Sequence, residues 1–401
     1  MKNHWNFYTA GQLAFGFGAV ASIADFVQRR RLTRALLVTD RLLVRAGVVT
    51  PIEAVLSEAC VTVETFDGSE AEPSIAVALQ AIDTARKFDP QVIVGVGGGS
   101  NMDLAKIVAI SVTHGGSPHD YFGFDNVPGP VLPLICVTTT AGTGSEVSHA
   151  AVLTDTEHAM KVSTLSNYLR PQLAVVDPEL TLSCPRQVTA DSGIDALTHA
   201  IEAYTATDFD KLAAPPGAET GYEGRFPLAD CLAEKAIRLI GQHLVTAVHE
   251  PTNRTAREGM SLAATLAGIA FSNAGVAIVH ALEYPLGGML HCSHGAGNGL
   301  LLPYVMRFNQ PARRETFARI ATLLGRDVAG QSLDEAAAQA ISAVEDLRRE
   351  IGIPDRIREL GGTVEQLPEF ARKAFSLQRL MWVNPRQPTE EDLLNIYREA
   401  F

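Results

Sequence analysis

Four side chains in the second half of the chain have the types and spacing of metal ligands. Asp195 and His199 stand four positions apart, so on a helix both would lie on one face and reach the same ion. His280 ends an apolar helical stretch, and His294 comes just after a glycine-rich turn. One carboxylate and three imidazoles suit Fe(II) or Zn(II) and leave a coordination position for a substrate oxygen. A single histidine on an apolar face is more often a core residue than a ligand, so the predicted metal site depends on all four together.

A further histidine, His291, lies close to His294 in the sequence. It competes for the ligand role or for a role in proton transfer, and the sequence leaves both assignments open. The metal itself also stays undecided between iron and zinc, because carboxylate and imidazole serve both.

A glycine-rich segment in the first half has the features of a phosphate-binding loop. Gly97, Gly98, Gly99 and Ser100 follow an apolar, β-branched run and precede a helical segment at 101–106. Glycines let backbone N–H groups approach a pyrophosphate, and a helix N-terminus favours its negative charge. The spacing is not the GxGxxG fingerprint, and a glycine cluster after a strand is equally typical of a tight turn.

Two further polar features accompany this loop. Asp40 ends the first clear strand, where a carboxylate can accept hydrogen bonds from an adenosine ribose and repel a 2′-phosphate, which favours NAD over NADP. A helix cap or a solvated turn is the alternative role for Asp40. The segment 138–146 follows another strand and offers hydroxyls and backbone donors to phosphate or nicotinamide. Loops after successive parallel strands meet at the carboxyl edge of the sheet, where ligands bind.

The elements that would position these residues differ between the two halves. Helical segments alternate with short apolar, β-branched runs at 35–39, 61–66, 92–96 and 133–137, and the last strand-like run lies around 173–178. This alternation predicts a parallel α/β sheet. After Pro185 the sequence reads as amphipathic helices nearly to the end. We therefore predict a Rossmann-like NAD-binding α/β domain over 1–187 and an all-helical metal- and substrate-binding domain over 188–401.

The segment 207–226 interrupts the helical half. It is rich in Pro, Gly, Asp and Ala and lacks helical periodicity, so we predict a loop or insertion between two helices. A mobile surface excursion and a lid over the substrate site are both consistent with this composition.

Length, composition and charge narrow the functional classes. A chain of 401 residues suggests two domains, and 46% hydrophobic with 19% charged residues is typical of a globular protein. The formal net charge of −12 argues against a nucleic-acid partner. The sequence has no signal-peptide pattern or uninterrupted membrane span, and its five scattered cysteines lack CxxC spacing. We therefore expect a cytoplasmic protein with reduced thiols and no membrane partner.

Together these segments resemble the iron-containing (group III) alcohol dehydrogenase family over essentially the whole chain. The residues that carry the resemblance are 97–106, 139–146, 195–204, 271–273 with His280, 285–287, 294–295 and 384–386.

The resemblance implies a dehydroquinate synthase-like architecture, with an N-terminal dinucleotide-binding α/β domain and a C-terminal all-helical domain. It implies one divalent ion, Fe(II) before Zn(II), held by Asp195, His199, His280 and His294. Contacts to NAD are implied for Asp40, Gly97, Gly98, Gly99, Ser100, Asp103, Thr139, Thr140, Thr143, Ser145 and Lys161. Homodimers are common among such proteins, so we expect a homodimer.

The chain departs from the family pattern near the predicted chemistry. Tyr284 stands where related lactaldehyde reductases have a second histidine, four residues after the one matched by His280, so the usual proton-relay histidine is absent. Tyr284 or His291 would take over this catalytic role. Asn101 stands where a Pro usually follows the Gly-Gly-Gly-Ser sequence, and Glu72 stands where an Asn usually precedes a Pro.

The expected activity is hydride transfer between a small primary alcohol, diol or hydroxy acid and the nicotinamide, with the metal polarising the substrate oxygen. Tyr284 and the segment 207–226 are more similar to the hydroxyacid-oxoacid transhydrogenase branch, which retains its nicotinamide. An acidic substrate would need cationic groups, for which the candidates are Lys211, Arg225, Arg379 and Arg386. The sequence also leaves open a dehydroquinate synthase-like lyase and a non-catalytic dinucleotide-binding protein.

Overall fold

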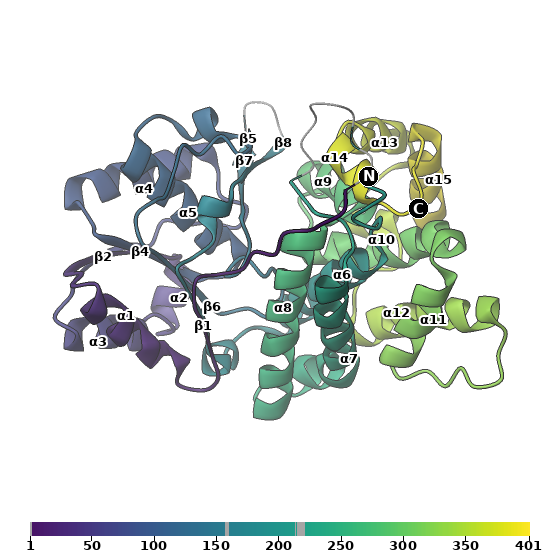
Figure 1. The fold of residues 1–401 in the computed structure, drawn as a ribbon, viewed down its shortest axis with the longest axis horizontal. Helices are drawn as coiled ribbons and strands as arrows, with labels where there is room; N and C mark the ends of the chain where they lie inside the picture. The colour runs from purple at the N-terminus through teal and green to yellow at the C-terminus, as the bar shows by residue number, and fades with distance from the viewer. Residues whose placement is uncertain (1, 157–159, 213, 215–220) are drawn as a thin grey trace. The chain divides into compact units, whose positions relative to one another are not determined.

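The computed structural model describes residues 2–156, 160–212, 214 and 221–401. The chain divides into two compact units, one formed by Tyr8–Cys184 and the other by Pro185–Phe401 together with Met1–Phe7 (Figure 1). The predicted division lies after residue 187, with the first seven residues in the α/β unit. The N-terminal segment instead packs with the helical unit, where the Trp5 ring stacks on Phe226 with a centroid distance of 4.4 Å.

The unit Tyr8–Cys184 is built on a six-stranded sheet in which every neighbouring pair is parallel. The strands, in spatial order, are β1 (Leu13–Phe15), β9 (Leu173–Val176), β6 (Leu134–Thr138), β4 (Val92–Gly97), β2 (Arg34–Val38) and β3 (Thr62–Phe66). The predicted α/β fold class is thereby confirmed. The chain runs from β2 to β3 and then crosses to β4 on the other side of β2. The ends of β2 and β4 therefore border the topological switch point, where open parallel sheets bind their ligands.

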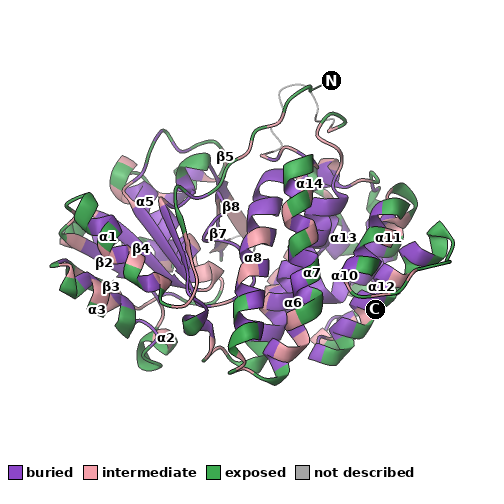
Figure 2. Cartoon of the chain, turned by 60° about the horizontal axis from the view of Figure 1, so that its bottom comes forward, coloured by how far each residue is buried: buried purple, intermediate pink, exposed green. Residues whose placement is uncertain are grey.

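Side chains of the strands alternate between two apolar layers. The covering helices are α1 (Ser22–Arg29), α3 (Thr50–Glu58), α4 (Ile75–Phe88) and α5 (Gly99–His114). Ala35 and Leu37 of β2 share a core with residues of α1 and α3. Leu36 and Val38 share the opposite core with residues of α4 and α5. The inner strands β2, β4, β6 and β9 are thus buried on both faces, as the purple strands in Figure 2 show, which explains why they read as continuous apolar runs.

The sequence patterns did not predict β1 or a second, three-stranded sheet. The strands of this sheet are β5 (Gly123–Phe124), β8 (Met160–Leu165) and β7 (Ala150–Asp155). β7 and β8 are antiparallel, with Lys161 opposite Thr154. β1 has three residues and β5 has two, which is too short for a strand periodicity to be recognised.

The second unit is built from helices. They are α6 (Arg186–Thr205), α7 (Pro227–His249), α8 (Arg254–Ala274), α9 (Ile278–Leu290), α10 (His294–Asn309), α11 (Arg314–Leu323), α12 (Leu333–Ile351), α13 (Leu367–Phe375), α14 (Gln378–Val383) and α15 (Glu390–Ala400). α6, α8 and α10 are buried around almost their whole circumference. Polar side chains on these three helices therefore face the protein interior, which is unusual unless they bind something or each other.

The apolar stretch before His280 is not a single helix, so the prediction that His280 ends one is wrong. Gly275 has a φ of 113°, and its N–H donates to Phe271 O, which closes α8. α9 begins at Ile278, and His280 lies in its first turn. α8 and α9 meet at 105°. Within the described ranges, no single helix is long and apolar enough to cross a membrane, although this bent pair has such length and composition jointly.

The described ends of the segment 207–226 lie side by side. Phe209 N donates to Arg225 O at 2.9 Å, and Arg225 N donates to Thr207 O at 2.8 Å. Arg313 fixes the start of the segment, because its guanidinium donates to two carbonyls at the end of α6 and pairs with Asp208 at 2.9 Å. Residues 213 and 215–220 lie outside the described chain. The two roles predicted for the segment, a surface excursion and a lid, therefore both stay predictions.

Candidate functional site

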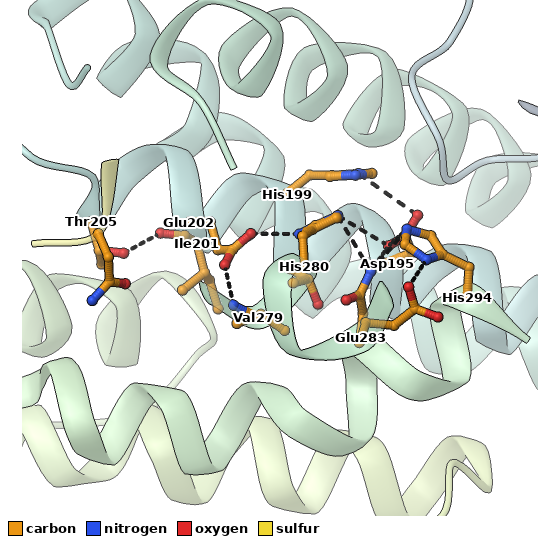
Figure 3. Close-up of polar contacts among 12 residues, drawn as sticks. Asp195, His199, Ile201, Glu202, Thr205, Val279, His280, Glu283 and His294 are labelled. Carbon is orange, nitrogen blue, oxygen red and sulfur yellow. Dashed lines mark hydrogen bonds and ion pairs between the residues drawn. The ribbon is translucent and has the colours of Figure 1, made fainter. Parts of the chain in front are cut away.

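Three helices bring predicted metal ligands together (Figure 3). Asp195 on α6, His280 on α9 and His294 at the start of α10 each present one ligand atom, and the three atoms lie within 4.8 Å of one another. The Nε2 atoms of the two histidines are each 3.9 Å from Asp195 Oδ1. Each of these two separations is less than twice the usual ligand distance of about 2.0–2.2 Å, so one ion can contact both atoms of either pair. Asp195 and His280 are buried, whereas the His294 side chain is 32% exposed, so the group opens on the side of His294.

Two buried carboxylates orient the histidine rings. Glu202 Oε2 accepts from His280 Nδ1 at 2.6 Å, and Glu283 Oε2 accepts from His294 Nδ1. A carboxylate can only accept, so both rings carry their hydrogen on Nδ1 and direct the lone pair of Nε2 towards Asp195. Glu202 also accepts from Val279 N at 2.7 Å, which ties the start of α9 to α6. Such carboxylate–histidine pairs are typical of metal-binding imidazoles.

Asn298 contacts all three ligand atoms. Its Nδ2 is 2.8 Å from Asp195 Oδ1 and 3.3 and 3.2 Å from Nε2 of His280 and His294. Glycines in the same turn of α10 make this close packing possible. A Cβ on Gly295 would lie 2.0 Å from a backbone oxygen of α6, and one on Gly297 would lie 2.9 Å from Glu283 Cγ on α9.

His199 lies one helical turn after Asp195, as predicted, but outside the group of three. Its Nδ1 is 3.9 Å from Asp195 Oδ2. Its ring stacks on the ring of His280 at 4.8 Å and on that of Phe271 at 4.2 Å. Its assignment as the fourth ligand remains a prediction.

The charge of Asp195 is maintained by its neighbours. Burial raises the pKa of this carboxyl, but electrostatic interactions with the rings of His199, His294 and His280 and the hydrogen bond from Asn298 outweigh that effect and bring the pKa below its ordinary value. Asp195 is therefore an anionic ligand group at neutral pH.

The two candidates for proton transfer occupy different positions. The Tyr284 ring on α9 has its centroid 6.2 Å from that of His294, the exposed member of the group. His291 is exposed and forms the C-cap of α9 with a φ of 53°, where its N–H donates to Gly287 O. Tyr284 is thus placed beside the ligands, while the backbone of His291 ends a helix.

In the α/β unit, β4 ends in the predicted phosphate-binding loop. Gly98 is the N-cap of α5, which begins at Gly99. Gly97 has a φ of 143°, and a Cβ there would lie 2.1 Å from Asn101 Nδ2. A Cβ on Gly99 would lie 3.0 Å from the side chain of Thr143. Both positions therefore favour glycine, which leaves the backbone N–H groups at the start of α5 without covering side chains.

The loop after β6 lies against the glycine loop. Thr139 N donates to Gly97 O at 3.0 Å. The Thr140 hydroxyl is buried and has no hydrogen-bond partner among the described residues, and it lies 3.6 Å from the place a Cβ would take on Gly98. Buried hydroxyls normally have a hydrogen-bond partner, and a phosphate bound at the start of α5 would supply one to Thr140. The residues present thus fit a dinucleotide.

Asp103, Lys106 and Ser145 form a buried network beneath this loop. Asp103 accepts from Ser145 Oγ at 2.6 Å and from Val152 N at 3.0 Å. Lys106 Nζ donates to Ser145 O at 2.8 Å and to Ala150 O at 2.7 Å. Burial lowers the pKa of Lys106, and Asp103 offsets this only in part. These side chains fix the loop, and direct contacts of Asp103 and Ser145 with NAD remain predictions.

Asp40 caps a helix at the end of β2. Its Oδ1 accepts from the N–H groups of Leu42 and Leu43 at 2.9 and 3.0 Å, which starts the short helix α2 (Arg41–Arg45). The capping role that the sequence left open is therefore present, and it leaves lone pairs for a ribose hydroxyl.

Lys161 is tied to the glycine loop through Glu72. Lys161 Nζ lies 2.7 Å from Glu72 Oε1, and Glu72 N donates to Ser100 Oγ at 3.2 Å. The departure from the family pattern at Glu72 therefore places a carboxylate beside a predicted NAD residue.

The site residues predicted from the sequence do not include Glu202, Glu283 and Asn298. Each of them follows a ligand on the same helix at a spacing of three, four or seven residues, which places it on the face of that ligand. An acidic residue in an apolar helix was the available signal, because Glu is almost never fully buried unless it is paired. Among the cationic candidates for an acidic substrate, Lys211 pairs with Asp208 at 2.9 Å and Arg225 with Asp230 at 3.0 Å.

A parallel α/β unit with an anion-binding loop at its switch point, and a helical unit with converging carboxylate and imidazole ligands, are the parts of a metal-dependent, dinucleotide-linked dehydrogenase. The chain belongs to the iron-containing alcohol dehydrogenase family. The sequence model of the iron-containing alcohol dehydrogenase family matches residues 10–178. The sequence model of the family's C-terminal region matches residues 222–401.

Similarity to individual alcohol dehydrogenases extends over the whole chain. It is 38% identical over 389 residues to 1,3-propanediol dehydrogenase of Klebsiella pneumoniae, covering 96% of each chain. It is 34% identical over 395 residues to the NAD-dependent methanol dehydrogenase of Bacillus methanolicus, covering 98% of this chain and 99% of that one. The crystal structure of a 1,3-propanediol oxidoreductase matches with a TM-score of 0.93 and 37% identity over 100% of both chains. The protein is therefore a metal-dependent, NAD-linked alcohol oxidoreductase.

Proposed function

We propose that this enzyme interconverts small primary alcohols or diols and their aldehydes, with Fe(II) held by Asp195, His199, His280 and His294. The observation that carries this proposal is the convergence of three ligand atoms within 4.8 Å, two of them on rings oriented by buried carboxylates. Similarity to proteins named for 1,3-propanediol and methanol supports a small alcohol substrate. Zn(II) is the second candidate, because the same ligands suit it.

When bound, the ion supplies a Lewis acid to the substrate oxygen and the nicotinamide supplies the hydride acceptor. The residues of the chain bind and orient these groups. Glu202 and Glu283 keep two Nε2 lone pairs directed at one point, and Asp195 supplies the negative charge there. Burial of Asp195 and His280 keeps water away from one side of the reacting oxygen, which strengthens every charge interaction at this point.

The dinucleotide is assigned to the loops that follow β2, β4 and β6. Asp40 would accept from the adenosine ribose, and the start of α5 at 97–100 would bind the pyrophosphate. The Thr140 hydroxyl, which has no hydrogen-bond partner within the described part of the chain, supports a ligand at this place. The remaining contacts are assigned to Thr139, Thr143, Ser145, Asp103 and Lys161.

Proton transfer is assigned to Tyr284, with His291 as the second candidate. Tyr284 is half-buried and lies beside His294 on the open side of the ligand group. A phenol at this place can pass the proton of the alcohol towards solvent. We expect Tyr284→Phe to lower kcat while the bound metal stays stoichiometric, and His291→Ala to leave kcat unchanged. If His291→Ala lowers kcat and Tyr284→Phe does not, proton transfer is assigned to His291 instead.

The experiment that tests the proposal is NADH formation, followed by absorbance, by protein stripped of metal and reloaded with Fe(II) or Zn(II). The substrates are primary alcohols, 1,2- and 1,3-diols and hydroxy acids. We expect metal-dependent turnover of alcohols and diols, and none by Asp195→Ala. Turnover that survives chelation would contradict the proposal. Phosphate release from a sugar phosphate without net NADH would instead identify a dehydroquinate synthase-like lyase.

A hydroxyacid-oxoacid transhydrogenase is the second candidate function, because Tyr284 and the segment 207–226 resemble that branch. The carboxylate partners of Lys211 and Arg225 weigh against it, since they neutralise two of the cations that an acidic substrate would need. Exchange between a hydroxy acid and an oxo acid without added NAD would establish this activity. We also propose a cytoplasmic homodimer on the family resemblance, and sedimentation equilibrium tests the dimer.

A further inference from the structure

The side chain of Asn101 crosses the glycine loop and ends on Asp40. Asn101 is 3% exposed and lies in the first turn of α5. Its Nδ2 donates to Val96 O at 3.0 Å and to Asp40 Oδ2 at 2.8 Å, so both amide hydrogens are used. The loop makes room for this side chain at Gly97, where a Cβ would lie 2.1 Å from the same nitrogen.

Asp40 is consequently held through both of its oxygens. Oδ1 accepts from the N–H groups of Leu42 and Leu43, and Oδ2 accepts from Asn101. The backbone contacts alone would fix one oxygen and let the other swing with the side-chain torsion. The amide removes that freedom and still leaves lone pairs on the carboxylate for a further donor.

The contact lies at the switch point of the sheet. Asp40 follows β2 and the glycine loop follows β4, and these neighbouring strands are the pair at which the strand order reverses. A ligand with its phosphates at the start of α5 would bring its ribose to Asp40. We propose that Asn101 is a positioning residue that holds the Asp40 carboxylate in the orientation that accepts ribose hydroxyls and repels a 2′-phosphate. This inference rests on the proposed function, in which Asp40 binds the ribose of NAD.

This contact depends on the identity of residue 101. A Pro, which is usual at this position in the family, has no side-chain amide to donate to Asp40. A Pro would be tolerated by the backbone, since the first turn of a helix does not need its N–H. The backbone hydrogen bond at the start of α5 runs from Met102 N to Gly98 O, one residue later. Asn101→Pro and Asn101→Ala therefore both keep the helix start and remove the contact.

The test measures dissociation constants of NAD and NADP for the metal-loaded full chain by calorimetry. We expect Asn101→Ala and Asn101→Pro each to lower the ratio of the NADP constant to the NAD constant by roughly fivefold. Tyr121→Phe is the matched control, because it removes a hydrogen bond to Gly115 O in the same unit away from the loop. It should lower thermal stability without changing the ratio.

A second background separates positioning from a general effect on the fold. Asp40→Ser keeps a capping oxygen but removes the carboxylate. If Asn101 acts through Asp40, adding Asn101→Ala to Asp40→Ser leaves the ratio unchanged. An unchanged ratio in the single Asn101 variants, or an equal fall in the Asp40→Ser background, would overturn the inference while NAD binding by the wild type stands. Failure of the wild-type chain to bind NAD would overturn the proposed cofactor as well.

Discussion

The metal centre and the cofactor loops build a binding site in opposite ways. At the metal centre, charged and polar side chains from three helices converge, and each is fixed by another side chain, as Glu202 fixes His280 and Glu283 fixes His294. At the cofactor loops the main contributors are backbone N–H groups and the absence of side chains at Gly97 and Gly99. At the metal centre a few charged atoms bind the ligand. At the cofactor loops, the shape of the backbone and several weak hydrogen-bond donors act together.

This difference determines how each site should respond to substitution. Loss of one ligand at the metal centre leaves the other buried polar groups without their common partner, so the response should be all or none. The cofactor loops should respond gradually to lost hydrogen bonds but sharply to added volume, because a Cβ has no room at selected positions.

The largest effect is expected for Asp195→Ala. It removes the anionic ligand, and the loss of several kcal/mol of charge stabilisation should reduce kcat/KM by at least about a thousandfold. Bound iron or zinc, measured by mass spectrometry after gel filtration, should fall below one tenth of an equivalent. Asp208→Asn, a carboxylate change in the same unit, is the matched control and should keep full metal content. A stoichiometric ion in Asp195→Ala would show that the centre is not the one described.

The cofactor loops offer a matched pair of glycines. A Cβ on Gly97 would lie 2.1 Å from Asn101 Nδ2 and the φ of 143° disfavours any L residue, whereas the nearest atoms to a Cβ on Gly98 are 3.6 Å away in Thr140. We expect Gly97→Ala to lower the free energy of unfolding by about 1–3 kcal/mol, and Gly98→Ala to change it little. Urea unfolding measures both. Both variants should keep their metal, because the centre lies in the helical unit.

Equal destabilisation by the two alanines would break the comparison, since shape would then not be the deciding factor at the loops. If Gly98→Ala weakens NAD binding without changing stability, the space beside Thr140 belongs to the ligand rather than to the fold.

The sequence made parts of both sites predictable, for different physical reasons. Asp195 and His199 could be paired because residues four apart lie on the same face of a helix, and the glycine loop could be placed because a strand and a helix flank it. The orientation of His280 could not be predicted. It depends on a helix break at Gly275, and the φ of that residue is a property of the folded chain. Glu202, Glu283 and Asn298 act across helices, so their partners appear only once the helices are packed.

The short strands β1 and β5 were missed for a related reason. They are held by pairing with β9 and β8, and three or two residues carry no pattern of their own. The sheet order, which brings Asp40 next to the glycine loop, likewise follows from the packing of helices on both faces rather than from any one segment.

A smaller effect than that of Asp195→Ala is expected for Glu283→Ala. The substitution removes the acceptor of His294 Nδ1 and leaves the ligand atom in place, so metal affinity should fall by about 10–100-fold rather than disappear. Competition with a chromophoric chelator measures this change. Glu345→Ala, which removes a surface partner of Arg307, is the control and should leave the affinity unchanged. An unchanged affinity in Glu283→Ala would mean that the ring of His294 is held by packing alone.

The smallest effect concerns a charge in the helical unit away from the metal centre. Burial raises the pKa of Asp208, but its hydrogen bonds and ion pairs with Lys211 and Arg313 outweigh this, so the folded-state pKa lies below the ordinary value. The stabilisation is therefore present above the unfolded-state pKa of about 3.9 and is lost as the pH falls through the folded-state value.

We expect Asp208→Asn to lower the free energy of unfolding near neutral pH by roughly 0.5–1 kcal/mol, because the pair is partly exposed. The difference from the wild type should shrink as the pH falls below the ordinary aspartate pKa, and urea unfolding across this range measures it. A difference that is constant with pH would assign the effect to the shape of the hydrogen bonds rather than to charge. In that case, charge interactions in the helical unit would be important only at the metal ligands.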